Sequence, residues 1–198
     1  LARAGADLVI AARRSGPIQE AAEEARGLGR RAVALPTDVT DSSQVNRMVE
    51  RTLAEFGKVD VLINNAGMVR EQRAVPIWEI SDEEWHVGLD SNLTGAFYCA
   101  RAVAKPMADR GGAKIINVAS GYGLRGGRDN YIYCCAKGGV VQLTRVLAPS
   151  LSRYGIICTC MAPGYIPTES GQGGWVPARG EFIPIGRVGE AEEIGPLA

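Results

Sequence analysis

Short apolar runs alternate along this chain with amphipathic stretches, and this alternation restricts the possible folds more than any other feature. The runs that have the length of buried strands are residues 8–12, 31–35, 59–63, 114–119 and 156–161. Strands that alternate with helices predict βα units around a parallel sheet. Because the chain has 198 residues and no internal repeat, we expect residues 1–198 to form a single α/β domain.

The stretches between these runs predict long helices. Their expected ranges are residues 17–28, 41–56, 82–110 and 130–154. The third helix contains Gly88 and Pro106, so it is expected to be broken or kinked, and Pro149 is expected to bend the end of the fourth. Residues 170–189 are rich in Gly and Pro, which predicts a loop.

Charge and cysteine content exclude several classes of function. Lys+Arg and Asp+Glu both number 22, so no basic field indicates nucleic acid or an anionic membrane as a partner. No apolar run approaches the length of a membrane helix. The five cysteines are interpreted as reduced thiols of a cytoplasmic protein. A single histidine, His86, and the lack of a Cys-x-x-Cys motif argue against a metal site.

Tyr133 and Lys137 lie four residues apart in a predicted helix, and Ser120 precedes the tyrosine by thirteen residues. Positions i and i+4 share one helix face, with Cβ atoms roughly 5–6 Å apart. A cation held that close to a phenol stabilises the phenolate, so the phenol can exchange a proton with a carbonyl oxygen. Ser120 offers a second hydroxyl for the same oxygen. The pair alone also occurs by chance in helices; Tyr131 is the weaker candidate because Cys135 stands four residues after it.

Further polar or turn-forming residues follow the predicted strands. Asp38, Asn64, Ser120 and the dipeptide Pro163-Gly164 each come directly after or at the end of an apolar run. In an open parallel sheet, ligands bind outside the carboxyl ends of the strands. We therefore expect these positions to surround one site.

The end of the run at residues 8–12 bears on the choice of cofactor. An acid there would bond the 2′-hydroxyl of an adenosine ribose and select NAD, whereas an arginine accommodates a 2′-phosphate. The chain has Arg13 and Arg14 at this point and no acid. This predicts NADP(H) rather than NAD(H); the alternative is that both arginines are simply solvated.

Taken together, these segments resemble the short-chain dehydrogenase/reductase family over essentially the whole length. The matching segments are Asp38-Val39, Asn64-Asn65-Ala66-Gly67, Asn92, Ser120, Tyr133 with Lys137, Pro163-Gly164 with Thr168, and Gly186-Arg187-Val188-Gly189 with Glu193-Ile194. The resemblance implies that the catalytic residues are Asn92, Ser120, Tyr133 and Lys137. The residues expected to bind the dinucleotide are Arg13, Arg14, Asp38, Val39, Asn65, Ala66, Gly67, Tyr133, Lys137, Pro163, Gly164, Ile166 and Thr168.

The resemblance also implies a doubly wound Rossmann-type sheet of about seven parallel strands in the order 3-2-1-4-5-6-7. On that expectation the chain is truncated at both ends. The strand and Gly-rich phosphate loop that would lie between the runs at Leu8 and Val59 precede the chain, and the last strand follows it. Two strand edges would then be unpaired, so this span is expected to fold poorly and to bind dinucleotide weakly by itself.

The implied activity is hydride transfer between a nicotinamide and a small carbonyl or secondary alcohol, with Tyr133 as general acid and base. A non-catalytic dinucleotide sensor or interaction module of the same fold is the alternative. A 3-oxoacyl thioester and a sugar or polyol both remain open as substrates. We expect Tyr122, Leu124, Tyr165 and Trp175 to line the substrate side, and the resemblance implies a homotetramer or homodimer.

Overall fold

The computed structural model describes residues 1–67, 75–167 and 183–197. Its strands all pair in parallel and are β1 (Leu8–Ala12), β2 (Ala32–Pro36), β3 (Val61–Asn64), β4 (Ala113–Val118) and β5 (Ile156–Met161). Helices separate consecutive strands, as the alternation of the sequence predicts. The α/β fold class with parallel sheets is therefore confirmed.

The strands form two sheets instead of one. β1 pairs with β2, and β3, β4 and β5 pair in that order. The neighbours agree with the order implied by the family resemblance, but among the described residues no ladder joins β1 to β3. The described strands thus have the two unpaired edges that the family resemblance implied. The division falls between the two strands where a further strand was expected.

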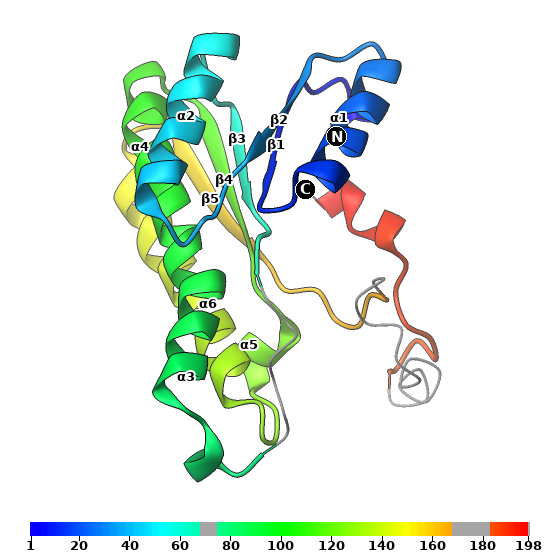
Figure 1. Cartoon of the computed structure of the whole chain (residues 1–198), viewed down its shortest axis with the longest axis vertical. Coiled ribbons are helices and arrows are strands. Elements are labelled where there is room, and N and C mark those ends of the chain that lie inside the picture. Colours follow the sequence, from blue (N-terminus) through cyan, green and yellow to red (C-terminus); the bar gives the residue numbers. More distant parts are fainter. Residues whose placement is uncertain (68–74, 168–182, 198) are drawn as a thin grey trace.

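Helices cover the strands on both sides (Figure 1). The helices are α1 (Ser15–Gly27), α2 (Ser42–Phe56), α3 (Asp82–Leu89), α4 (Gly95–Arg110), α5 (Gly121–Arg125) and α6 (Tyr131–Ser152). Figure 1 shows α1 on one side and α2, α4 and α6 on the other. Short 3₁₀ turns occur at Ala2–Ala4, Ile77–Glu79, Ala191–Glu193 and Gly195–Leu197. Among the described residues, no helix is both long and apolar enough to cross a membrane.

Local sequence signals explain where α2 begins and ends. Asp41 is the N-cap, and its carboxylate accepts from the main-chain N–H groups of Ser43 and Gln44. Hydrogen bonds from the side chains of Ser43 and Gln44, followed by these main-chain bonds, lower the pKa of Asp41 to about 2. Gly57 ends the helix at φ 73°, a left-handed conformation that glycine adopts without a steric penalty. Asp41 thus acts as a cap, and it fixes the chain direction just after Asp38.

The main core lies between the second sheet and the helices beside it. Its buried members are Val49, Ala100, Val103, Met107, Ala113, Ile115, Ile156 and Cys158. The first sheet has a much smaller core of three buried alanines, Ala22, Ala25 and Ala32. Because stabilisation by burial grows with the apolar area removed from water, the second sheet carries most of it.

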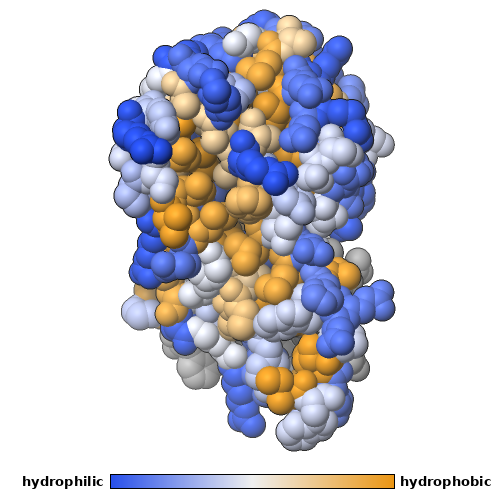
Figure 2. All heavy atoms as spheres, turned by 90° about the vertical axis from the view of Figure 1, so that its left-hand side faces the viewer, coloured by the Kyte–Doolittle hydropathy of each residue, from blue (hydrophilic) through white to orange (hydrophobic). Residues whose placement is uncertain are grey.

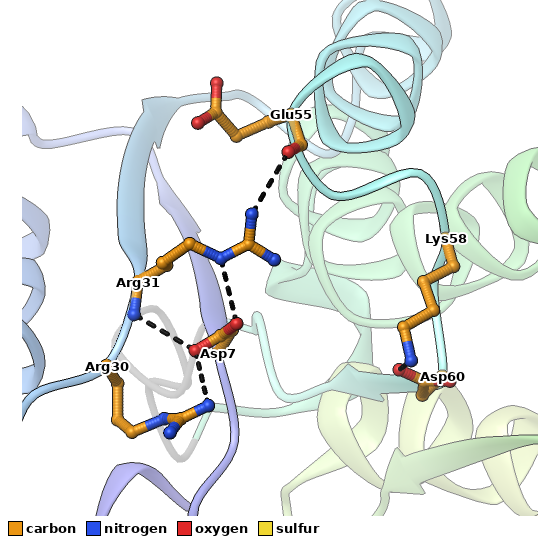
Figure 3. A network of polar contacts seen from close by, with 6 residues as sticks. All are labelled: Asp7, Arg30, Arg31, Glu55, Lys58 and Asp60. Carbon is orange, nitrogen blue, oxygen red and sulfur yellow. Dashed lines mark hydrogen bonds and ion pairs between the residues drawn. The ribbon is translucent and has the colours of Figure 1, made fainter.

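An ion-pair network holds the starts of β1 and β2 together (Figure 3). The Asp7 carboxylate accepts from the main-chain N–H and the Nε of Arg31, at 3.0 Å each, and Arg30 lies 2.7 Å from it. The hydrogen bonds from Arg31 keep the pKa of Asp7 below its ordinary value of 3.8. Arg31 also donates to the main-chain oxygen of Glu55, at 3.5 Å. This arginine therefore connects the first sheet to the end of α2.

The predicted helix over residues 82–110 is in fact three segments. α3 and α4 are separated by a π-helical segment, η3 (Asp90–Thr94), in which the Gly95 N–H donates to the oxygen of Asp90. Pro106 lies inside α4 without ending it. The short helix α5 was not predicted, because five residues containing two glycines carry no helical pattern.

Candidate active site

The carboxyl ends of the strands bring the predicted residues to one region. A Cβ added to Gly67, just after β3, would lie 2.5 Å from Asn92 Oδ1 and 3.3 Å from Lys137 Nζ. A Cβ on Gly95, which follows η3, would lie 2.6 Å from Cγ2 of Val39, after β2. Segments from β2, β3, η3 and α6 thus meet, even though the strands belong to two sheets.

Ser120 follows β4 and is the N-cap of α5. Its Oγ accepts from the main-chain N–H of Tyr122, at 3.2 Å, and the residue is 8% exposed. A hydroxyl that accepts in this way still has its own O–H proton to donate. Ser120 is therefore oriented by a backbone hydrogen bond and is able to donate to a substrate oxygen.

Tyr133 and Lys137 lie on the same face of α6, as their spacing predicts. The Lys137 Nζ is 5.7 Å from the centroid of the Tyr133 ring. It also donates to the main-chain oxygen of Val118, at 2.9 Å, which ties it to the end of β4. Since an ammonium has three donors, this bond leaves capacity for further hydrogen bonds.

Burial makes Lys137 an unusual lysine. The residue is 4% exposed, and this desolvation lowers its pKa from 10.5 to about 8, an effect that the nearby Cys160 partly opposes. Desolvation disfavours the charged form of an amine. At pH 7 the group is still mainly protonated, so it can act as the cation beside Tyr133.

Tyr131 has different surroundings. Its hydroxyl donates to Oδ1 of Asp129, at 3.3 Å. Desolvation and the neighbouring anion raise the pKa of Tyr131 above 10.0. A carboxylate keeps a phenol protonated, which is the opposite of what proton transfer at neutral pH needs. This favours Tyr133 over Tyr131, as the spacing to Lys137 also does.

Asn92 lies in η3 and is 2% exposed. Its Nδ2 donates to the main-chain oxygen of Gly88, at 3.0 Å. Its Oδ1 faces the Cα of Gly67, in the direction where Lys137 Nζ also lies. π-helical segments occur often at functional sites because they displace one side chain from the regular helical face.

A buried polar chain behind the site was not predicted in full. Asn64 Nδ2 donates to Asn117 Oδ1 at 2.8 Å, and Asn117 Nδ2 donates to Thr144 Oγ1 at 2.9 Å. Asn117 has 0% exposure. The chain connects β3 and β4 to α6, two turns after Lys137. The sequence offered one signal for this chain of hydrogen bonds. Asn64 and Asn117 are polar residues at the end of and within apolar runs, and buried polar groups need hydrogen-bond partners.

The sequence also did not predict that helices approach each other closely at glycine residues. A Cβ on Gly123 would lie 2.6 Å from the carbonyl carbon of Lys137 and 2.9 Å from the nitrogen of Gly138. One on Gly139 would lie 2.6 Å from Leu93 Cδ2. The backbones of α5 and α6 therefore approach closely at the turn that carries Lys137. Sequence alone shows the glycines but not what faces them.

The remaining predicted dinucleotide residues lie around the same edge. Arg13 and Arg14 directly follow β1 and are exposed. Asp38 Oδ1 accepts from the N–H and the hydroxyl of Thr40, at 2.9 and 2.8 Å, so one carboxylate oxygen is engaged in its own turn. Both segments thus lie directly after the carboxyl ends of β1 and β2.

The nicotinamide end has candidates after β3 and β5. Asn65, Ala66 and Gly67 are exposed after β3. Pro163 accepts from the N–H of Gly121 at 3.2 Å, and Gly164 and Ile166 follow it. The predicted Thr168 and Trp175 lie outside the described residues. Gly67 thus lies close to Asn92 and to the buried ammonium of Lys137.

Comparisons with known proteins agree with this geometry. The family model described as "short chain dehydrogenase" matches residues 1–174. A 3-oxoacyl-[acyl-carrier-protein] reductase of Synechocystis sp. is 34% identical over 166 residues, which are 84% of this chain and 66% of that protein. The chain thus spans just under two thirds of the length of that relative.

Two solved structures have the same fold. A short-chain type dehydrogenase/reductase from Mycobacterium marinum is 35% identical, with a TM-score of 0.91 over 99% of this chain and 78% of that one. A gluconate 5-dehydrogenase from Burkholderia cenocepacia, in complex with NADP and tartrate, is 33% identical, with a TM-score of 0.90 over 100% and 78%. By its matching family model, its relatives and its fold, the chain belongs to the short-chain dehydrogenase family.

Proposed function

We propose that this protein is an NADP(H)-dependent oxidoreductase that interconverts a carbonyl and a secondary alcohol, with residues 1–198 as one dinucleotide-binding domain. The observation that carries the proposal is the arrangement of Tyr133 beside the buried ammonium of Lys137. Membership of the short-chain dehydrogenase family supports it. Its similarity to a 3-oxoacyl-[acyl-carrier-protein] reductase and to a gluconate 5-dehydrogenase also supports it.

In this mechanism the Tyr133 hydroxyl gives its proton to the substrate oxygen during reduction and takes it back during oxidation. The Ser120 O–H donates to the same oxygen and stabilises the negative charge that develops there. Lys137 stabilises the phenolate and, with its remaining donors, binds a ribose hydroxyl. Asn92 holds a water near Lys137 that returns protons. The nicotinamide supplies hydride chemistry when bound, and the protein supplies position and charge.

The dinucleotide would be held by Arg13, Arg14, Asp38, Val39, Asn65, Ala66, Gly67, Tyr133, Lys137, Pro163, Gly164, Ile166 and Thr168. Arg13 and Arg14 carry the preference for NADP(H), because a guanidinium pairs bidentately with a phosphate. A solved gluconate 5-dehydrogenase with the same fold binds NADP, which supports this choice. The small substrate would enter beside Ser120.

We further propose a cytoplasmic homotetramer or homodimer. The five cysteines are free, which fits a reducing compartment. Figure 2 shows hydrophobic side chains gathered in a band on the side of the molecule that α2 and α4 cover. Exposed apolar side chains of α4 and α6 include Phe97 and Val146. Such a face supports self-association through these helices.

The decisive experiment replaces Tyr133 with Phe and follows the absorbance band of the reduced nicotinamide over a panel of carbonyl compounds. Turnover should fall on the order of 10²–10⁴-fold, because the proton donor is lost. The binding free energy of NADPH should weaken by no more than one hydrogen bond, about 0.5–1.5 kcal/mol. Tyr131→Phe, on the same helix, is the matched control and should keep its rate. If Tyr133→Phe retains the wild-type rate, Tyr133 is not the general acid.

Cofactor choice is tested by Arg13→Asp. The ratio of kcat/KM for NADPH to that for NADH should fall by about 10-fold or more, since a charge-assisted hydrogen bond contributes about 1.5–3 kcal/mol. Arg3→Asp makes the same charge change on an exposed side chain at the other end of β1 and should leave the ratio unchanged. If the ratio is unaltered in Arg13→Asp, Arg13 is solvated and does not contribute to the choice of cofactor.

A further inference from the structure

A chain of buried side-chain hydrogen bonds runs through the fold near Lys137. Asn64 Nδ2 donates to Asn117 Oδ1 at 2.8 Å, and Asn117 Nδ2 donates to Thr144 Oγ1 at 2.9 Å. The Thr144 hydroxyl in turn donates to the main-chain oxygen of Val140 at 2.9 Å. The hydroxyl proton is thus used within α6, and a lone pair of the same oxygen faces the asparagine. We name the side chains of Asn64, Asn117 and Thr144 the asparagine chain.

The asparagine chain joins the elements that carry the candidate catalytic residues. Asn64 is the last residue of β3 and precedes the segment that ends at Gly67. Its Nδ2 also donates to the oxygen of Ala96, at 3.2 Å, in the first turn of α4 after η3. Asn64 and Asn117 are partners in the ladder of β3 and β4, and Thr144 belongs to α6. One set of bonds therefore ties β3, β4, α4 and α6 together.

Two neighbouring residues of β4 hold the same face of α6. The Val118 oxygen accepts from Lys137 Nζ at 2.9 Å, and the Asn117 amide donates to Thr144. Lys137 and Thr144 are seven residues apart, which is close to two turns, so they share a helix face about 10.5 Å apart along the axis. Two points on one face fix the rotation of a helix as well as its position. The flexible stem of a lysine could not do this alone.

The apolar contacts between α6 and the sheet select this rotation less sharply. Leu147 and Leu151 of α6 pack on the core cluster that contains Ile115. Apolar burial is non-directional, so it favours contact without setting the angle to within the tolerance of a hydrogen bond. Asn117 lies two residues after Ile115 and therefore on the same face of the strand. Its amide supplies a directional contact beside the apolar ones.

Burial makes the asparagine chain sensitive to the loss of any member. Asn117 is 0% exposed, Thr144 is 6% exposed and Asn64 is 8% exposed. A buried amide N–H whose acceptor is removed is left unsatisfied, which costs the desolvation of that group. Removal of the Thr144 hydroxyl therefore favours a shift of α6 against β4.

We propose that Asn117 is a positioning residue for Lys137. By holding Thr144, it sets the rotation of α6 at which the Lys137 ammonium meets the Val118 oxygen. The same rotation places the ammonium beside the ring of Tyr133. This rests on the proposed function, in which that ammonium stabilises the phenolate of Tyr133. Asn117 acts through α6 and not on the reacting atoms.

The pKa of Lys137 reports where its ammonium lies. Burial lowers this pKa from 10.5 to about 8, and Cys160 partly opposes the effect. If α6 turns, the long stem of Lys137 can carry the ammonium toward water, which raises the pKa. The groups around this side chain come from α6, β5, β4, η3 and α5, and they are Tyr133, Cys160, Val118, Asn92 and Gly123.

The test compares Thr144→Val with Thr144→Ser. Valine has the shape of threonine without the acceptor for Asn117, whereas serine keeps the hydroxyl. The sequence contains four lysines, so NMR of isotope-labelled lysine can follow each titration, and the Lys137 signal is assigned by its loss in Lys137→Met. In Thr144→Val the titration midpoint of Lys137 should rise by on the order of one pH unit toward 10.5. The kcat for carbonyl reduction should fall about 10-fold to 100-fold. Thr144→Ser should restore both.

Thr52→Val is the matched control. The Thr52 hydroxyl makes the same bond within its own helix, to the oxygen of Met48 at 2.7 Å on α2. This variant should change neither the Lys137 midpoint nor kcat. If Thr144→Val unfolds below the assay temperature, Thr144→Ala carries the test, because it removes the hydroxyl without placing a methyl group against Asn117.

The two measurements separate this proposal from the proposed function. A raised midpoint with wild-type kcat would support Asn117 as a positioning residue and refute the role of Lys137 in proton transfer. An unchanged midpoint in Thr144→Val would overturn the positioning role, whatever the rate. So would a midpoint that stays raised in Thr144→Ser, because the hydroxyl would not be the cause. If the wild type reduces no carbonyl compound, the proposed function fails and the titration still decides the role of Asn117.

Discussion

Burial of the charged Lys137 side chain lowers the free energy of unfolding, and the size of this effect depends on pH. Its pKa is lowered to about 8 by burial, whereas an unfolded lysine has its ordinary value of 10.5. Between these values the unfolded chain binds more protons than the folded one. The free energy of unfolding therefore rises with pH through this window. Below pH 8 the full cost of burying the charge is present.

Urea unfolding of the wild type and of Lys137→Met between pH 7 and pH 10 measures this effect. The stability of the wild type relative to the variant should rise with pH above about 8, with a slope of up to about 1.4 kcal/mol per unit. The variant also loses the hydrogen bond to Val118, but this loss does not depend on pH and cancels from the slope. A difference that stays constant would mean that Lys137 is solvated.

Among individual residues, the sequence could predict those whose chemistry depends on spacing along one helix or strand. Tyr133 and Lys137 are such a pair, since helical periodicity alone puts them together. It could not predict Asn117 or Gly123, because their importance arises from what another element places against them. No local pattern reports that the backbone of Lys137 lies 2.6 Å from where a Gly123 Cβ would be.

The close crossing of helices α5 and α6 determines the geometry of the candidate active site. Gly123→Ala would put a methyl group against the backbone of Lys137 and Gly138, which cannot turn aside as a side chain can. α5 should shift and take Ser120 with it. We expect kcat to fall on the order of 10²-fold, as for a misplacement of about 1 Å. Stability should fall by about 1–3 kcal/mol.

Gly27→Ala is the matched control for this crossing. Gly27 is also helical, but a Cβ there meets nothing within 4 Å. It should leave kcat unchanged and stabilise the fold by up to about 1 kcal/mol, because alanine is the better helix former. Steady-state rates and thermal unfolding of both variants provide the measurement. A wild-type kcat in Gly123→Ala would show that α5 does not position Ser120.

The long elements were the predictable ones. The range Leu8–Ala12 and the range Ile156–Met161 agree with the apolar runs, because a buried strand needs an uninterrupted apolar sequence. α5 and η3 were not predicted. The first is stabilised by the Ser120 cap and its contact with α6, and the second by a hydrogen-bond shift within a continuous helical pattern. Tertiary contacts decide both.

For the whole molecule, the division of the sheet predicts uneven stability. β1 and β2 are backed by a small alanine core, whereas β3, β4 and β5 are backed by the larger cluster around Ile115 and Met107. Native-state hydrogen exchange in low urea should show the amides of β1 and β2 opening at lower free energy than those of β4. Equal opening energies in the two sheets would show that they unfold as one unit.

The α/β class and its parallel pairing could be read from the sequence, and the unpaired edges of β1 and β3 were expected from the family resemblance. Alternating runs predict which strands exist, and the neighbours of β3, β4 and β5 followed from the family resemblance. Whether β1 and β3 are joined depends on what lies between them, and no periodicity within either strand reports it.

The π-helical segment Asp90–Thr94 also changes the angular position of the following side chains around the helix axis. Each residue of an α-helix advances the side chains by roughly 100°. Insertion of one residue between α3 and α4 therefore rotates one helix face relative to the other, and it allows α3 to pack on α6 while α4 packs on α2. The local change in winding thus lets two consecutive helices place their main contacts on different neighbours.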